Sequence, residues 1–325
     1  PLGLALSDFH PMAPPALALQ TQELTKTYRT GFWLRQKITS LKQVSLTVHI
    51  GETFGLLGPN GAGKTTFMKL ILGIIRPTAG GGTVLGRPLG DRFIKARIGY
   101  LPENPYLYES LTGWECLELM ATLHQVPRSV QKQRLPALLE LVGLAQSAAR
   151  KKTLRRYSKG MLQRIGLAQS LVNDPDLVLL DEPMSGLDPL GRYQVREIIL
   201  QLKSQGKTIF FNSHILSDVE HLCDRVAVLA RGELLAVGTF AELLGTGQTY
   251  HVRGRGGSAA DLAPWLEHFE FQGGLWQGQL RLSLPEFVQK VQESGAEILS
   301  LNLERQSLEE FFVQQLRQRG YTQSV

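Results

Sequence analysis

Three short segments carry the residues of this 325-residue chain that could do chemistry. The first runs from 58 to 66 and fits the pattern G-x-x-x-x-G-K-[ST]. In such a loop, backbone N–H groups surround phosphates, the lysine reaches the β- and γ-phosphates, and the hydroxyl after it can bind Mg²⁺. The segment therefore predicts a phosphate-binding loop made of Gly58, Pro59, Asn60, Gly61, Ala62, Gly63, Lys64, Thr65 and Thr66.

The flanks of this loop have the order that phosphate binding requires. Residues 53–57 are apolar and predict a buried parallel strand, and residues 67–72 predict a helix that ends at Gly73. The start of that helix would add the positive end of its dipole to the site. The alternative is a chance glycine turn, and the strand–loop–helix order argues against it.

The second segment places two acids directly after an apolar run. Leu177–Leu180 is followed by Asp181, Glu182 and Pro183, as when a buried strand ends at the carboxyl edge of a parallel sheet. One carboxylate at that edge can hold Mg²⁺, and the next can polarise a water for attack on the γ-phosphate. A solvated strand end is the alternative.

The third segment, 208–214, predicts another strand, and this one ends in His214. A lone histidine is usually structural, but this one would lie on the same sheet edge as the two acids and is a candidate γ-phosphate sensor. Separately, Ser158 is a plausible N-cap of the helix that follows it, and a helix start binds anions well.

Composition limits the classes of protein to which the chain can belong. The chain is 43% hydrophobic and 20% charged, and no apolar run approaches the roughly 18 residues of a membrane-spanning helix. Its two cysteines lack CxxC spacing, which favours a reducing compartment. The net charge of +6, with a pI of about 9.3, fits contact with anionic lipid or with nucleic acid and does not choose between them.

The remaining patterns predict an α/β fold with a mixed sheet, interrupted by a helical insert at about 105–165. Residues 1–18 are proline-rich and predict a disordered lead. Residues 29–40 predict a basic, aromatic loop that is either a hairpin tip or a contact for lipid or a partner. The glycine-rich residues 77–90 predict turns. The basic end of the insert, 150–156, is more typical of a solvated face than of a binding site.

A glycine-rich joint near 246 predicts a domain boundary, with one domain over 19–246 and an accessory α+β domain over 247–325. The second part predicts the order βαββαβ plus a final helix, the ferredoxin-like arrangement. Its strands are expected at 249–253, 269–272, 279–284 and 297–303. Its expected core is Trp265, Leu280, Leu282, Phe287, Val291, Ile298, Leu301, Phe311 and Phe312.

Together these segments resemble the ATP-binding cassette (ABC) family, over roughly residues 19–245. The resemblance is to the nucleotide-binding subunit of an ABC transporter, closest to bacterial export and drug-resistance cassettes with separate membrane subunits. It implies a phosphate-loop ATPase that uses ATP and Mg²⁺. It further implies that 58–66 is Walker A and that Tyr28 stacks on adenine.

The resemblance also assigns roles to the other motif residues. It implies that Asp181 is the Walker B acid, Glu182 the catalytic base and His214 the switch histidine, and that Thr65, Asp181 and Glu103 surround the metal. Residues 157–163 match the signature, with Ser158 and Gly160 kept in Y-S-K-G-M where L-S-G-G-Q is common, and Asp188 belongs to the D-loop. Glu103 stands where the family has glutamine, which would add a charge at the metal.

Partners follow from the same resemblance. It implies two copies facing head to tail around two ATP molecules, transmembrane subunits as partners, no nucleic acid, and a peripheral place on the cytoplasmic face of a membrane. A soluble cassette ATPase acting on nucleic acid or the ribosome is the alternative. The cassettes of translation usually have two copies in one chain, and DNA-repair cassettes carry a long coiled coil, whereas this chain has one cassette and no heptads there.

Overall fold

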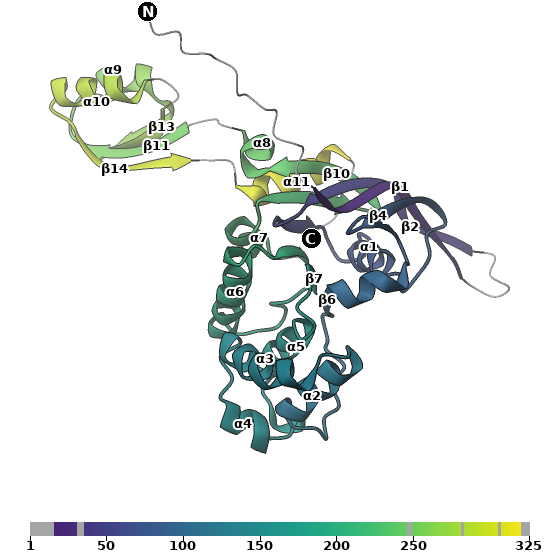
Figure 1. The fold of residues 1–325 in the computed structure, drawn as a ribbon. Coiled ribbons are helices and arrows are strands. Elements are labelled where there is room, and N and C mark those ends of the chain that lie inside the picture. The colour runs from purple at the N-terminus through teal and green to yellow at the C-terminus, as the bar shows by residue number, and fades with distance from the viewer. Residues whose placement is uncertain (1–15, 31–35, 246–248, 281–282, 305–306, 320–325) are drawn as a thin grey trace, which may run out of the picture. The chain divides into compact units, whose positions relative to one another are not determined.

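A computed structural model describes residues 16–30, 36–245, 249–280, 283–304 and 307–319. These residues form two compact units, one ending at Thr239 and the other beginning at Phe240 (Figure 1). The predicted boundary near 246 lies outside the described residues. So do residues 1–15 of the predicted lead, whereas residues 17 and 18 already belong to the first strand.

The first unit begins with an antiparallel sheet in the order β2-β1-β4-β5. Its strands are β1 (Leu17–Thr30), β2 (Gln36–His49), β4 (Ala79–Val84) and β5 (Arg87–Pro88). Alternating apolar residues of β1 and β2, such as Leu19, Val44 and Val48, are fully or almost fully buried. β1 and β2 pair as an antiparallel hairpin around 29–40, which agrees with the hairpin alternative for this segment. Residues 29–30 and 36–40 belong to the two strands, so the predicted loop is too long, and 31–35 lie outside the described residues.

The turns predicted for the glycine-rich residues 77–90 are wrong over β4. A Cβ at Gly82 would stand 2.2 Å from the carbonyl oxygen of Gln20, and one at Gly80 would stand 2.2 Å from that of Glu23. Glycine is needed here because β4 packs closely against the backbone of β1, and at Gly80 also because its φ of 72° lies in the left-handed region.

A six-stranded sheet in the order β10-β9-β3-β8-β7-β6 forms the centre of the first unit. All neighbouring pairs are parallel except β9 with β10, so the sheet is mixed as predicted. The carboxyl ends of β3, β7 and β8 therefore meet at one edge. The strands are β3 (Thr53–Leu57), β6 (Ile98–Leu101), β7 (Leu177–Asp181), β8 (Thr208–Ser213), β9 (Arg225–Ala230) and β10 (Glu233–Thr239).

Phe210 occupies the middle of the core of this unit. Its ring centroid lies 5.7 Å from that of Phe54 and 5.8 Å from that of Phe67, and all three side chains are fully buried. These residues come from β8, β3 and the helix α1 (Lys64–Ile71), so the aromatic cluster joins the strand before the phosphate loop to the helix after it.

Helices cover this sheet and form the predicted insert, which lies around α2 to α5 in Figure 1. The insert begins with a capping box in which Thr112 and Glu115 satisfy each other's backbone N–H groups. The helices are α1 (Lys64–Ile71), η2 (Arg92–Arg97), α2 (Gly113–Leu123), α3 (Arg128–Leu141), α4 (Gln146–Lys151), η3 (Leu154–Arg156), α5 (Lys159–Ser170), α6 (Pro189–Ser204) and α7 (Leu216–Leu222).

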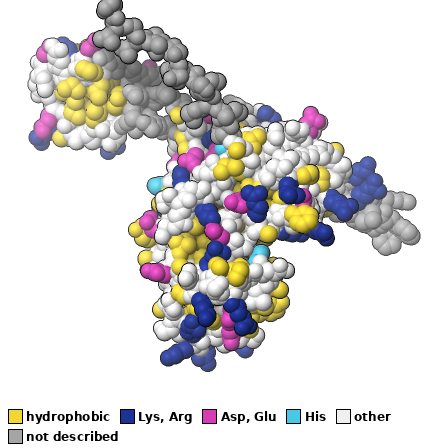
Figure 2. Space-filling model, viewed as in Figure 1, with side chains coloured by type: hydrophobic (Ala, Val, Ile, Leu, Met, Phe, Trp, Pro, Cys, Tyr) yellow, Lys and Arg dark blue, Asp and Glu magenta, His cyan; other side chains and the backbone are white. Residues whose placement is uncertain are grey.

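Basic side chains gather around α4 at the end of the insert (Figure 2). They are exposed, as expected for a solvated face. The guanidinium carbon of Arg150 lies 3.3 Å from the ring centroid of Trp114, which holds that side chain on the protein surface. None of the described helices is both long enough and apolar enough to span a bilayer.

The second unit contains a four-stranded antiparallel sheet in the order β12-β13-β11-β14. The element order agrees with the predicted βαββαβ plus a final helix, and the assignment to the ferredoxin-like class stays a prediction. The elements are α8 (Phe240–Leu244), β11 (Thr249–Arg255), α9 (Ala259–Leu262), η4 (Ala263–Trp265), β12 (Glu267–Gln272), β13 (Leu275–Leu280), α10 (Leu284–Glu293), β14 (Glu297–Glu304) and α11 (Leu308–Gln318).

The core of this sheet differs in part from the expected one. Leu280, Phe287 and Val291 are buried as predicted, but Leu301 is 38% exposed and Leu282 lies outside the described residues. Trp276 is buried and was missed, because β13 begins four residues earlier than the predicted strand. Its ring meets that of Phe287 edge-on at 6.1 Å.

Candidate functional site

The loop between β3 and α1 has the glycines that its path requires. Gly61 and Gly63 have φ angles of 79° and 111°, in the left-handed region that side chains disfavour. A Cβ at Gly63 would stand 2.5 Å from the carbonyl oxygen of Ser40, and one at Gly58 would stand 2.2 Å from that of Leu229. The loop is therefore held closely between β2 and β9, with its N–H groups near the start of α1.

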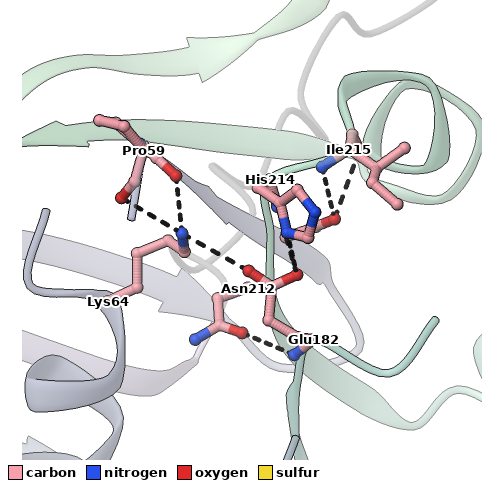
Figure 3. Close-up of polar contacts among 8 residues, drawn as sticks. Pro59, Lys64, Glu182, Asn212, His214 and Ile215 are labelled. Atoms are coloured by element: carbon pink, nitrogen blue, oxygen red, sulfur yellow. Dashed lines mark hydrogen bonds and ion pairs between the residues drawn. The ribbon is translucent and has the colours of Figure 1, made fainter. Parts of the chain in front are cut away.

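Lys64 is buried beneath this loop, with 6% of its surface exposed. Its ammonium donates a hydrogen bond of 2.6 Å to the carbonyl oxygen of Gly58 and lies 3.5 Å from Oε1 of Glu182 (Figure 3). The sequence places both residues at this edge of the sheet but does not show the contact between their side chains, because the two meet only in the folded sheet. A phosphate that entered the loop would compete with Glu182 for this charge.

Glu182 is the first residue after β7, and its backbone is strained. Its φ of 50° is unusual for a residue with a side chain, and its N–H donates a 2.8 Å hydrogen bond to Oδ1 of Asn212. Nδ1 of His214 lies 2.7 Å from Oε2 of Glu182 (Figure 3). The carboxylate is thus held between Lys64 and His214. Asn212, the next-to-last residue of β8, is a supporting residue that the sequence analysis did not single out.

Asp181 is 4% exposed, and its Oδ1 has no hydrogen-bond partner among the described residues. Burial raises the pKa of this carboxyl, and the charges of Glu182 and Glu103 raise it further, while Asn212 and Lys64 act in the opposite sense. A buried acceptor without a partner is costly, and it indicates a site that a ligand completes. An oxygen donor of this kind fits Mg²⁺, as does the hydroxyl of Thr65 at the same site.

A cavity of about 440 Å³ is lined by the phosphate loop, Glu182 and His214, whereas Asp181 is not part of its lining. The predicted residues that line it are Pro59, Asn60, Gly61, Ala62, Gly63, Lys64, Thr65, Thr66, Glu103, Glu182 and His214. Two further hydroxyls, of Ser40 and Ser185, also line it and were missed. The Ser40 hydroxyl donates a 2.9 Å hydrogen bond to that of Thr66, so β2 helps to hold the start of α1.

Besides Gly58 and Asp181, whose contacts are given above, four predicted residues lie outside this lining within the described chain. Ser158 caps α5 by accepting a hydrogen bond from the N–H of Met161, and Asp188 caps α6 by accepting one from Gly191. Gly160 faces open space, since a Cβ there would meet only the Leu187 side chain, at 4.0 Å. The ring of Tyr28 lies on β1 with the Lys26 ammonium 5.2 Å from its centroid.

The helix starts at Ser158 and Asp188 are thus close neighbours, because Gly160 and Leu187 approach each other. No acidic residue lies in the first turn of α5 or of α6. The start of α5 is therefore electrostatically open to an anion, whereas the Asp188 carboxylate already occupies the start of α6.

A second cavity, of about 380 Å³, lies between β6, α2 and α5; we call it the groove. Tyr100, Pro105 and Tyr106 line one part of it, and Met120 of α2 and Gly166 of α5 line another. Tyr106 is 94% exposed, which is unusual for a large aromatic side chain. Pro102 and Pro105 line the groove, whereas Glu103 between them lines the first cavity, so the same loop borders both cavities.

Comparisons with known proteins agree with this geometry. The family described as "ABC transporter" matches residues 41–185. An ABC transporter ATP-binding protein of Nostoc sp. is 62% identical over 93% of this chain and 90% of its own length. A lantibiotic transport ATP-binding protein of Streptococcus pyogenes is 39% identical over 67% of this chain and 89% of its own length.

Among solved structures, a dimeric ATP-binding cassette in a post-hydrolysis state with ADP and Pi matches with a TM-score of 0.62 at 25% identity. The match covers 68% of this chain and 98% of that one.

Proposed function

Since the chain belongs to the ABC transporter family and is its ATP-binding, ATP-hydrolysing subunit, we propose that the 440 Å³ cavity binds ATP with Mg²⁺ and that hydrolysis drives export through separate membrane subunits. The observation that carries this proposal is the carboxylate of Glu182, held between Lys64 and His214 at the cavity wall. A base, Glu182, thus lies in contact with a cation, Lys64, and with a ring nitrogen of His214.

In the proposed reaction, Glu182 accepts a proton from a water as the water oxygen bonds to the γ-phosphorus in line with the leaving ADP oxygen. The products are ADP and inorganic phosphate. Lys64 moves from Gly58 and Glu182 to the phosphates, and His214 stabilises the charge that develops on the γ-phosphoryl oxygens. We assign adenine stacking to Tyr28.

The side-chain oxygen atoms at the site indicate which residues would hold the metal. Thr65 and Asp181 would hold Mg²⁺, and Glu103 would stand beside it with an added charge. When bound, the ion neutralises charge on the β- and γ-phosphates. No group of three or more His, Cys, Asp or Glu that could hold a metal alone occurs in the part of the chain that the structure describes, which fits an ion whose remaining ligands are phosphate oxygens and water.

A second copy of the chain would complete the site. Ser158 and Gly160 lie at the open start of α5, and Asp188 caps α6 beside it. All three lie away from the chain's own cavity, which supports a head-to-tail pair in which these residues face the partner's ATP. The dimeric state of the cassette solved with ADP and Pi supports the pairing of two copies. Each ATP would then contact residues of both copies, so ATP binding should control whether the two chains associate.

Association is tested on the Glu182→Gln chain, where ATP should produce a dimer by light scattering. Ser158→Asp keeps the N-cap but repels phosphate, and it should abolish that dimer without loss of ATP binding. Ser158→Thr keeps both functions and is the matched control. A Ser158→Asp chain that dimerises as well as the control would refute the shared site.

For the membrane subunits, we assign the groove and its exposed Tyr106 as the docking surface, and we place the chain peripherally on the cytoplasmic face. The lantibiotic transport relative supports export. Copurification of the chain from detergent-solubilised membranes should recover transmembrane subunits, and Tyr106→Asp should lose them. Full recovery with that variant would refute the assignment of the groove.

A further inference from the structure

The sheet of the second unit has one face covered by helices and one face open to solvent. α9 and α10 lie on one side of the sheet (Figure 1), and Val252, Trp276 and Leu280 form the core beneath them. Because side chains alternate along a strand, the residues between these three point to the opposite face. On that face lies a cavity of about 810 Å³, and Leu275 and Leu299 in its lining are 55% and 52% exposed.

Strand pairing arranges the side chains of this open face in rows that run across three strands. In each row, a residue of β13 lies between one residue of β12 and one residue of β11. A 2.6 Å hydrogen bond from Nε2 of Gln277 to Oε2 of Glu270 shows that such neighbours share the face. The rows, each given from β12 to β11, are Glu267, Gln279 and His251; Glu270, Gln277 and Arg253; and Gln272, Leu275 and Arg255.

The rows share one order of charge. The β12 side carries carboxylates or an amide, the central strand β13 carries neutral residues, and the β11 side carries basic residues. Arg255 already pairs with Glu297, at 2.6 Å. Arg253 makes no hydrogen bond or ion pair within the described part of the chain, so its charge is available to a partner.

This order of charge is self-complementary. When two copies face each other about a two-fold axis that runs along β13, the β11 side of each copy lies over the β12 side of the other. Neighbouring strands are about 4.8 Å apart and packed sheets about 10 Å apart, a gap that an arginine and a glutamate span together. Arg253 of one copy then meets Glu270 of the second copy, and Leu275 meets Leu275 of the second copy at the axis.

The mixture of charges also decides against other partners. The basic residues of β11 alone would attract anionic lipid or nucleic acid, but Glu267 and Glu270 on the same face would repel these polyanions. A face that presents both signs of charge at positions related by one axis favours a second copy of this chain.

We propose that the open face of the second unit pairs with the same face of a second copy, and that this pairing needs no ATP. It goes beyond the proposed function, since it uses neither the nucleotide cavity nor Ser158. By symmetry, the contact between Arg253 and Glu270 forms twice in each pair. The pairing would raise the effective concentration of one cassette near another before ATP binds.

Sedimentation of the full chain without nucleotide tests the pairing. One sheet face is a small interface, so a dissociation constant of about 10⁻⁵ to 10⁻⁴ M is expected. Arg253→Glu and Glu270→Arg each place like charges opposite one another twice, and each should weaken association by about tenfold or more. Glu286→Arg makes the same change at an exposed position of α10, on the helix side of the sheet, and should leave association unchanged.

Mixing the two single variants distinguishes a second copy from any other partner. In a mixed pair, the acids of the Arg253→Glu chain face the bases of the Glu270→Arg chain, so association should return to near the parental level. A chain that carries both substitutions should also associate with itself, because the acidic and basic positions are only exchanged. A surface that binds a different protein would regain nothing on mixing.

Three results would overturn the proposal: a parental chain that stays monomeric across this concentration range, single variants that associate as the parent does, or a mixture that does not associate. Binding to phosphatidylglycerol vesicles that is lost in Arg253→Glu and strengthened in Glu270→Arg would also overturn it and identify a lipid surface instead. Circular dichroism and ATP affinity should be unchanged in every variant, which excludes misfolding. Ser158→Asp should leave this nucleotide-free association unchanged, so failure of the sheet pairing and failure of the shared ATP site appear in different variants.

Discussion

Replacing Glu182 by glutamine should separate ATP hydrolysis from ATP binding. Glutamine keeps the shape of the side chain but cannot accept the proton of the attacking water. A positioned base contributes about 10²- to 10⁴-fold to a rate, so hydrolysis should fall by that factor. Phosphate release under single-turnover conditions measures the chemical step directly.

The same substitution should strengthen ATP binding, because Oε1 of Glu182 lies 3.5 Å from Nζ of Lys64. Two unit charges at that distance attract by about 1 kcal/mol even at the dielectric constant of water. A phosphate must overcome this attraction to reach Lys64, so its removal should tighten ATP binding by about five- to tenfold. A fluorescent ATP analogue, titrated without Mg²⁺, measures this affinity.

Glu118→Gln makes the same chemical change at an exposed position on α2 and is the control. It should leave both hydrolysis and binding at the parental level. Hydrolysis by the Glu182→Gln chain at the parental rate would show that Glu182 is not the base. Weaker ATP binding would show that the pair with Lys64 supports the loop and does not compete with phosphate.

Three further outcomes are expected. The pKa of Asp181 is raised in part by Glu103, and Mg²⁺ binding needs the ionised carboxylate. Glu103→Gln should therefore lower that pKa and move the acid limb of the ATPase pH profile to lower pH. An acid limb that stays in place or moves to higher pH would contradict this. Phe210→Ala should cost about 3–5 kcal/mol in the free energy of unfolding because it empties the aromatic core, whereas Phe93→Ala, 63% exposed, should cost about 0.5 kcal/mol or less by denaturant titration. Truncation after Gly245 should leave ATP affinity unchanged, since the cavity lining lies within residues 40–214, and a folded truncated chain that fails to bind ATP would refute this.

The sequence alone was sufficient to predict the elements around the phosphate loop. The glycines before Lys64 and the acids after Leu180 are local patterns, and local patterns report backbone conformation and strand ends well. Parallel pairing then implies that the carboxyl ends of these strands meet at one edge, so Lys64, Glu182 and His214 could be expected together. The structure agrees in each case.

Side-chain partners required the tertiary structure. The 2.6 Å hydrogen bond from Lys64 to Gly58 and the role of Asn212 depend on distances between strands that are remote in the chain. Ser40 entered the site because β2 passes over the loop, which no motif at residue 40 indicates. Such contacts have no pattern in sequence spacing, so sequence reasoning could not detect them.

Backbone packing also explains why a prediction made from glycine composition was wrong. Glycines at 80 and 82 predict a turn by composition, but they lie in a strand. Glycine occupies these positions because β1 leaves no room for a Cβ. By composition and spacing, the chain itself determined an α/β fold with a phosphate loop and two acids at a strand end. Only the tertiary structure decided which atoms those groups touch, because close approach between distant segments is set by packing and not by local preference.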